Sequence, residues 1–204
     1  MIIERCCISA AQVREAREAG ASRAELCQDL SVGGVTPSEE EVVAAVATGL
    51  PVNVLIRPRG GDFIYNEDEV AAMEKSIAFC RSAGVNGVVI GALDASGNVD
   101  MAVMRRLMAA SNGLSVTFHR AFDETASPFR ALEEIITLGC DRILTSGQCP
   151  TAVEGAGLLA ALVRKAAGRI IIMPGSGVSP DNIDALARAT GATEFHGTRL
   201  GILK

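Results

Sequence analysis

The sequence predicts a single TIM-type (β/α)8 barrel, with the eighth helix short or absent, formed by residues 1–204. Three observations support it: short runs rich in Val, Ile and Leu recur along the chain, amphipathic stretches separate them, and polar residues end nearly every run. Such alternation is typical of parallel βαβ units. An open, doubly wound sheet alternates too, but it gathers its site at one switch point, whereas a barrel brings eight strand ends to one mouth. The many polar strand ends therefore favour the barrel.

The strands are expected where the apolar runs begin, near Ile2, Arg23, Val52, Gly87, Leu114, Arg142, Arg169 and Thr193. Helices are expected in the stretches between them, which carry capping signals at their starts. Ser9 with Gln12 and Asn66 with Glu69 have the spacing of a capping box. Three further starts place a hydroxyl residue before a proline at the first helical position, at Thr36-Pro37, Ser127-Pro128 and Ser179-Pro180.

Only residues 197–204 follow the last expected strand, too few for a full eighth helix. An uncovered apolar strand face is costly in water. We therefore expect a short terminal segment or a second subunit to cover it.

The composition is that of a folded cytoplasmic protein. Hydrophobic residues make up 49% of the chain and charged residues 21%, and the net charge is −5, which argues against a nucleic-acid partner. No apolar run is long enough for a membrane span, and MIIERCC does not read as a signal peptide. The six cysteines lack zinc-site spacing and are expected to remain thiols in a reducing compartment.

Alternation along each strand predicts which side chains face the barrel lumen. Bulky apolar residues share one parity and polar residues the other, so the polar set is expected at the mouth. Isolated buried charges are rare unless they are paired or functional. Two interpretations stay open, an ion-pair network and a ligand or metal pocket. The predicted cluster comprises Glu4, Glu25, Arg57, His119 and His196, with Cys6 and Cys27 beside the glutamates.

The strand-end loops add candidate anion-binding groups. Gly175, Ser176 and Gly177 follow the seventh expected strand, where barrels often bind phosphate ahead of a helix N-terminus, although a tight turn would look the same. Ser146 follows the sixth expected strand and offers a hydroxyl donor. The planar guanidinium groups of Arg59 and Arg120 suit carboxylate or phosphate.

Several common chemistries have no support in the sequence. There is no nucleophile elbow, no P-loop and no H-E-x-x-H motif. No lysine ends an expected strand, which disfavours a Schiff-base aldolase. No organic cofactor is implied.

Several longer segments are recognisable. RAELCQDLSVGGVTPS, VLIRPRGGDFIYNEDE, VTFHRAFDE, which contains Asp123, and GATEFHGTR resemble the CutC copper homeostasis protein family over residues 2–199. The resemblance implies a TIM barrel, a cytoplasmic location and a homodimer. It also implies copper ligands in the E-x-C motifs of the first two strands, which match Cys6 and Cys27. Soft thiolates on adjacent strands suit Cu(I).

Two functions follow as expectations. The first is copper homeostasis through Cu(I) binding by Cys6 and Cys27. The second is an enzyme of unassigned reaction acting on a small anionic substrate, such as a phosphorylated molecule, at the barrel mouth. For that enzyme the candidate pocket residues are Glu4, Glu25, Arg57, His119, Asp123 and His196, and the candidate ligand-binding residues are Arg59, Arg120, Ser146, Gly175, Ser176 and Gly177.

Overall fold

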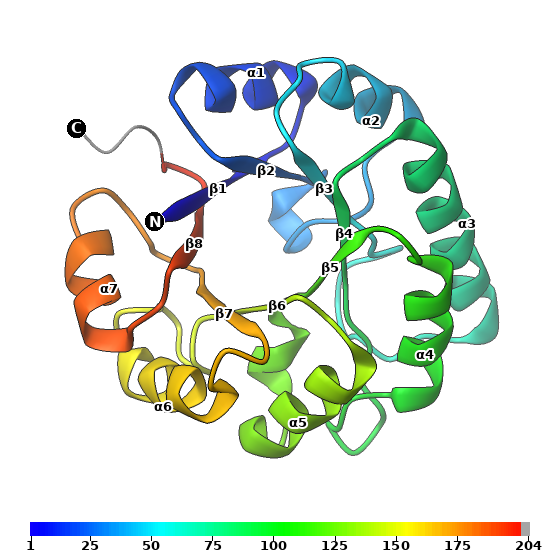
Figure 1. Cartoon of the computed structure of the whole chain (residues 1–204). Coiled ribbons are helices and arrows are strands. Elements are labelled where there is room, and N and C mark those ends of the chain that lie inside the picture. Colours follow the sequence, from blue (N-terminus) through cyan, green and yellow to red (C-terminus); the bar gives the residue numbers. More distant parts are fainter. Residues whose placement is uncertain (201–204) are drawn as a thin grey trace.

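The computed structural model describes residues 1–200, in which eight parallel strands surround a central axis and seven α-helices pack outside them (Figure 1). The strands are β1 (Ile2–Cys7), β2 (Arg23–Leu26), β3 (Val52–Leu55), β4 (Gly87–Ile90), β5 (Ser115–Phe118), β6 (Arg142–Thr145), β7 (Ile171–Pro174) and β8 (Glu194–Gly197). The helices are α1 (Ala10–Glu18), α2 (Glu39–Val46), α3 (Glu67–Ala83), α4 (Met101–Ala110), α5 (Pro128–Leu138), α6 (Ala156–Ala166) and α7 (Ile183–Thr190). Two 3₁₀ turns, η1 (Leu30–Val32) and η2 (Arg120–Glu124), follow β2 and β5.

The strands form a nearly closed barrel. They pair in the order β7-β6-β5-β4-β3-β2-β1-β8, and every ladder is parallel. Within residues 1–200 no ladder joins β7 to β8, so a seam runs between the two ends of that order (Figure 1). The predicted TIM-type barrel is confirmed. No helix follows β8 up to residue 200, and residues 201–204 lie outside the described part of the chain.

The strand side chains divide into two sets, as their alternation predicts. The large apolar cluster beneath the helices contains Leu26 of β2 and Val54 of β3. A separate small cluster inside the barrel mouth contains Cys6, Cys27, Leu55 and Val89. Each strand therefore sends alternate side chains to the helix layer and to the lumen.

Helix starts agree with the sequence at some positions and differ at others. α5 begins at Pro128 as expected, with Ser127 before it. α2 begins two residues after Pro37, because the Ser38 hydroxyl caps it by accepting from the Glu41 amide. The expected start of α7 at Pro180 is wrong.

α7 begins at Ile183, one turn later than the sequence predicts. The Asn182 side-chain oxygen accepts from the Ser179 amide at 2.9 Å, and its Nδ2 donates to the Gly177 carbonyl at 2.8 Å. These bonds hold a turn ahead of the helix. The glycine-rich loop after β7 is therefore separated from the helix N-terminus.

Replacement of Asn66 by Ala tests the predicted capping box of α3. The Asn66 side chain accepts from the Glu69 amide at 3.0 Å, and the Glu69 carboxylate accepts from the Asn66 amide at 2.9 Å. We expect the substitution to lower the free energy of unfolding by about 1 kcal/mol, measured by urea denaturation. An unchanged denaturation midpoint would contradict it; Ser76→Ala, at a half-buried site within the same helix, is the control.

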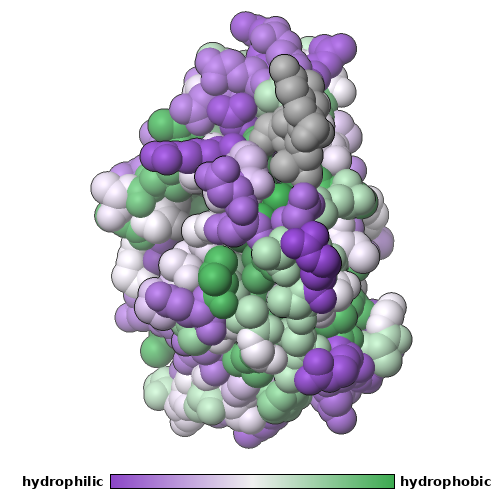
Figure 2. All heavy atoms as spheres, turned by 90° about the vertical axis from the view of Figure 1, so that its left-hand side faces the viewer, coloured by the Kyte–Doolittle hydropathy of each residue, from purple (hydrophilic) through white to green (hydrophobic). Residues whose placement is uncertain are grey.

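The side of the barrel that carries α7 and β8 has apolar residues gathered near its middle and hydrophilic residues around them (Figure 2). Ile2 pairs with Glu194 of β8 and is 39% exposed. No helix in the described residues is both long and apolar enough to cross a membrane.

Candidate functional site

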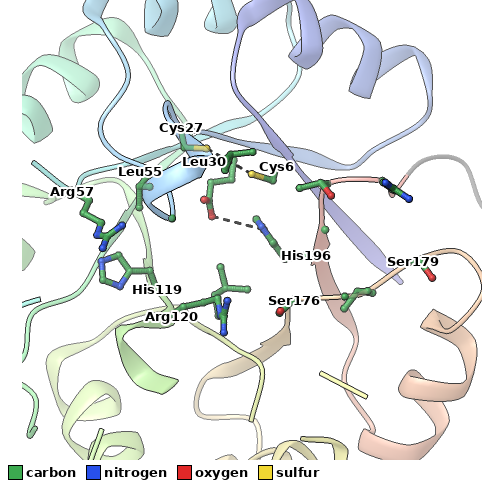
Figure 3. Close-up of a pocket in the computed structure, with 18 of the residues that line it drawn as sticks. Cys6, Cys27, Leu30, Leu55, Arg57, His119, Arg120, Ser176, Ser179 and His196 are labelled. Carbon is green, nitrogen blue, oxygen red and sulfur yellow. Dashed lines mark hydrogen bonds and ion pairs between the residues drawn. The ribbon is translucent and has the colours of Figure 1, made fainter. Parts of the chain in front are cut away.

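A cavity of about 580 Å³ opens at the carboxyl ends of the strands (Figure 3). It lies at the mouth where TIM barrels place their functional groups. Its lining comes from strand ends and from the loops after β2, β3, β5, β7 and β8. The lining residues are Cys6, Glu25, Cys27, Leu30, Gly33, Leu55, Arg57, Phe63, His119, Arg120, Leu144, Ser176, Gly177, Val178, Ser179, His196, Gly197, Thr198 and Arg199.

Cys6 and Cys27 meet at one wall of this cavity. β1 and β2 are adjacent, and the two sulfur atoms point toward each other at 3.7 Å (Figure 3). Both side chains are buried. The hydrogen bond with Cys27 and burial raise the pKa of Cys6 well above its usual range, so Cys6 is a thiol in the metal-free protein.

Glu4 lies one layer below Cys6 on β1 and is completely buried. Its carboxylate accepts from Arg23 Nε at 2.5 Å, from Asn53 Nδ2 at 3.1 Å and interacts with His196 Nδ1 at 2.9 Å. Burial opposes ionisation, but the hydrogen bond from His196 and the charge of Arg23 lower the pKa of Glu4 to about 2. Glu4 is thus a fixed anion in the lumen, and it does not line the cavity.

An ion-pair network extends from Glu4 across the lumen. Arg23 also donates to Glu194 at 2.8 Å, and the same Glu194 oxygen accepts from Arg142 at 2.8 Å. Arg142 reaches the Ser115 hydroxyl at 2.6 Å. Of the two interpretations of the polar cluster, an ion-pair network therefore describes Glu4 and its layer, while the groups above it line a cavity.

Glu25 and His196 form the layer that faces the cavity. His196 Nδ1 lies 3.8 Å from Glu25 Oε2, and that oxygen is buried without a hydrogen-bond partner. Burial raises the pKa of Glu25 to about 7, against the attraction of His196. Burial disfavours the cationic form of His196, yet the Glu25 charge and hydrogen bonds with Cys6 and Glu4 raise its pKa well above the usual range.

These groups have the spacing of a metal site. One ligand atom each from Cys6, Glu25 and His196 lies within 4.8 Å of the others, and Cys27 adjoins Cys6. Thiolate and imidazole are ligands that suit copper. Because Cys6 is a thiol and His196 a cation without metal, metal binding there must release protons.

Arg57 and His119 lie side by side at another part of the cavity lining (Figure 3). The Phe63 ring lies beneath both, 4.8 Å from Arg57 Cζ and 4.9 Å from the centre of the His119 ring. Burial, aided by the Arg57 charge, lowers the pKa of His119 to about 3, so the imidazole is neutral.

Asp123 and Ser146 connect two loops behind the cavity lining. The Asp123 carboxylate accepts from the Thr145 hydroxyl at 2.5 Å and from the amides of Ser146 and Gln148, each at 3.1 Å. Arg120 donates to Asp123 and to Ser146, and Arg120 itself lines the cavity. Asp123 and Ser146 therefore hold the loop after β6 against η2.

Of the remaining predicted residues, some line the cavity and others do not. Ser176 and Gly177 line the cavity, whereas Gly175 does not. Arg59 turns away and pairs with Glu69 at 2.5 Å, because β3 ends at Leu55 and strand alternation no longer controls residue 59. Roles for these residues stay predictions.

Comparison with known proteins identifies the family. The model of the CutC family matches residues 1–201. The chain belongs to the CutC family. A CutC relative from Parabacteroides distasonis is 52% identical over 204 residues, which is 99% of this chain and 84% of the relative. One from Xylella fastidiosa is 50% identical, covering 96% of this chain and 73% of the relative.

Solved structures agree with this family. The crystal structure of CutC from Streptococcus agalactiae matches with a TM-score of 0.93 at 34% identity, over 98% of this chain and 99% of that one. QR15, an aldolase, matches with a TM-score of 0.70 at 16% identity, over 97% of this chain and 89% of that one. The similarity to this aldolase shows only that the two chains share the barrel fold.

Sequence reasoning missed several groups that the CutC fold brings to the lumen and the cavity. Arg23 has the parity of Glu25 and could have been found by extending the alternation to the strand start. Phe63 and Arg199 come from loops whose paths no strand pattern predicts. Leu30 and Gly33 reach the cavity through η1, which the sequence did not indicate.

Proposed function

We propose that this protein takes part in copper homeostasis by binding Cu(I) at the barrel mouth through Cys6 and Cys27. The observation that carries the proposal is the 3.7 Å separation of the two sulfur atoms at the cavity wall. One soft cation can bind both thiolates, which are the ligands that Cu(I) prefers. The S. agalactiae relative carries a copper-homeostasis description, which also supports it.

The remaining groups at this wall complement the sulfurs. His196 offers an imidazole when it gives up its proton, and one ligand atom each of Cys6, Glu25 and His196 lies within 4.8 Å of the others. The ion is cargo in this proposal, so binding must be reversible as well as tight.

A competition titration of Cu(I) against a chelator, under reducing conditions, tests this function. We expect the wild-type protein to bind one Cu(I) tightly and the Cys6→Ser/Cys27→Ser variant to lose that binding. The matched control is Cys80→Ser/Cys140→Ser, which removes two buried thiols outside the cavity lining. Circular dichroism verifies that each variant folds.

Retained affinity in the Cys6→Ser/Cys27→Ser variant would refute the assignment. An equal loss in the Cys80→Ser/Cys140→Ser control would do the same.

A second function is favoured by the charges in the same cavity. Cu(I) needs soft ligands and no arginines, yet Arg57, Arg120 and Arg199 all line the site. We infer that the mouth also accepts a small anionic molecule, as a TIM-barrel enzyme of unassigned reaction would. Glu25 and His119 are the candidate groups for proton transfer in such an enzyme.

A cytoplasmic location and a homodimer complete the proposal. The six free cysteines suit a reducing compartment. The apolar area beside β8 supports a homodimer (Figure 2). Light scattering of the purified protein measures the assembly, and a monomer mass would contradict the dimer.

A further inference from the structure

Arg57 is a buried cation without a counterion. Its side chain is 5% exposed, and its guanidinium group donates to the carbonyls of Val32 and Gly34, each at 2.9 Å, and of Gly61 at 2.6 Å. Within residues 1–200, no carboxylate oxygen lies within 4.0 Å of its nitrogens. A buried charge is costly unless an opposite charge compensates it.

The other arginines inside the barrel are compensated. Arg23 pairs with Glu4 and Glu194, and Arg142 pairs with Glu194. Near Arg57 lies the Tyr65 hydroxyl, a neutral group whose pKa burial raises more than the Arg57 charge lowers it. The uncompensated charge of Arg57 therefore distinguishes the cavity wall from the lumen below.

His119 adds an unused donor beside this charge. Its Nδ1 accepts from the Ala121 amide at 3.2 Å, so in the neutral ring Nε2 carries the proton. His119 Nε2 is buried and has no acceptor, and Arg57 Nε is also buried and unpartnered. This wall thus offers a positive charge and two unmet N–H donors.

The two side chains pack against defined neighbours before any ligand binds. Phe63 packs against both, and the His119 ring lies against Gly91, where a Cβ would approach the ring atoms to 2.6 Å. The absence of a side chain at position 91 therefore makes room for the His119 imidazole.

We propose that Arg57 and His119 form the subsite for the anionic oxygen group of a small molecule, a carboxylate or a phosphate. Both unmet nitrogens are covered in this structure, so the two side chains turn toward the anion when it binds. The rest of the ligand then extends across the cavity toward His196 and Cys6 (Figure 3). The inference rests on the second proposed function and specifies which residues hold the anion.

Histidine ring ¹H–¹⁵N NMR tests the subsite, because the chain has only His119 and His196. The metal-free protein is titrated separately with sodium phosphate, sodium acetate and, for ionic strength, sodium chloride. We expect a saturable shift of the His119 signal with phosphate or acetate and none with chloride. A response to phosphate indicates a phosphorylated ligand, and a response to acetate alone indicates a carboxylate.

Arg57→Met should weaken this binding about tenfold or more, because a charge-assisted hydrogen-bond donor is lost. Arg106→Met is the matched control, since Arg106 pairs with Glu67 and Glu74 and does not line the cavity; anion binding to this variant should be unchanged. If Arg57→Met does not fold, the wild-type His119 shift decides alone.

The absence of a saturable His119 shift with both phosphate and acetate overturns the subsite, as does an equal loss of binding in Arg106→Met. Because no copper is present and no reaction is measured, this result is separate from the Cu(I) titration and from any test of catalysis.

Discussion

Replacing Arg23 with Met should lower the free energy of unfolding by about 3–5 kcal/mol, because it leaves buried carboxylates without their main partner. Arg23 contacts both Glu4 and Glu194, whose side chains are almost entirely inaccessible to solvent. Water cannot solvate the charge that remains. Urea denaturation followed by far-UV circular dichroism measures the loss, which suits a chain with no tryptophan.

Arg106→Met is the matched control for Arg23→Met. Arg106 also pairs with two glutamates, Glu67 and Glu74, but on the surface, where its side chain is 38% exposed. Its loss should cost no more than about 1 kcal/mol. A double variant that also carries Glu4→Gln should be more stable than Arg23→Met alone, since the fully buried Glu4 charge is removed while Glu194 keeps Arg142 as its partner. Equal losses from Arg23→Met and Arg106→Met would refute the explanation.

Lowering the pH should reduce the free energy of unfolding of the wild-type protein through protonation of His119. The His119→Asn variant should lack this part of the pH dependence. The folded-state pKa of about 3 is below the ordinary value of 6.5, so the unfolded chain binds a proton that the folded chain refuses. The stabilising contribution is complete above about pH 6.5 and falls by about 1.4 kcal/mol per pH unit as the pH drops toward about 3. Asn keeps a side-chain acceptor for the Ala121 amide and cannot titrate.

The comparison of the two proteins isolates His119 from other groups. Glu25, with its pKa raised to about 7, acts in the opposite sense between about pH 4.5 and 7, but it is present in both proteins. The stability advantage of wild type over His119→Asn should shrink by about 2 kcal/mol from about pH 7 to about pH 5. A constant difference over that range would show that His119 titrates normally.

The fold could be predicted from the sequence because short apolar strand runs alternate regularly with stretches of helical periodicity. Runs such as those of β3 and β4 have the apolar content of strands buried on both faces, and the residues between them have helical spacing and caps. Boundaries were less certain where a proline suggested a start. Pro180 lies in a turn that Asn182 holds, and no local propensity distinguishes that turn from a first helical residue.

The site could be predicted only as far as strand alternation extends. Glu25, Cys6 and His196 come from strands, and parity was enough to bring them together. Arg59 lies beyond the end of β3, where parity does not apply, and it turns to Glu69 instead. Phe63 enters from a loop, and the path of a loop depends on tertiary contacts that a pattern of residue types does not contain.

Because no ladder joins β7 to β8 within residues 1–200, the barrel is open along one line. In a fully closed barrel, widening one end strains every ladder. In this barrel, β7 and β8 can move apart along the seam without breaking a ladder. The loop that carries Ser176 and the end of β8 that carries His196 border that seam. Amide hydrogens facing it lack ladder partners and should exchange with deuterium fastest among the strand amides. We therefore expect the cavity to widen on the β7–β8 side. Arg57 follows β3, which is paired with a strand on each side, so it should keep its place.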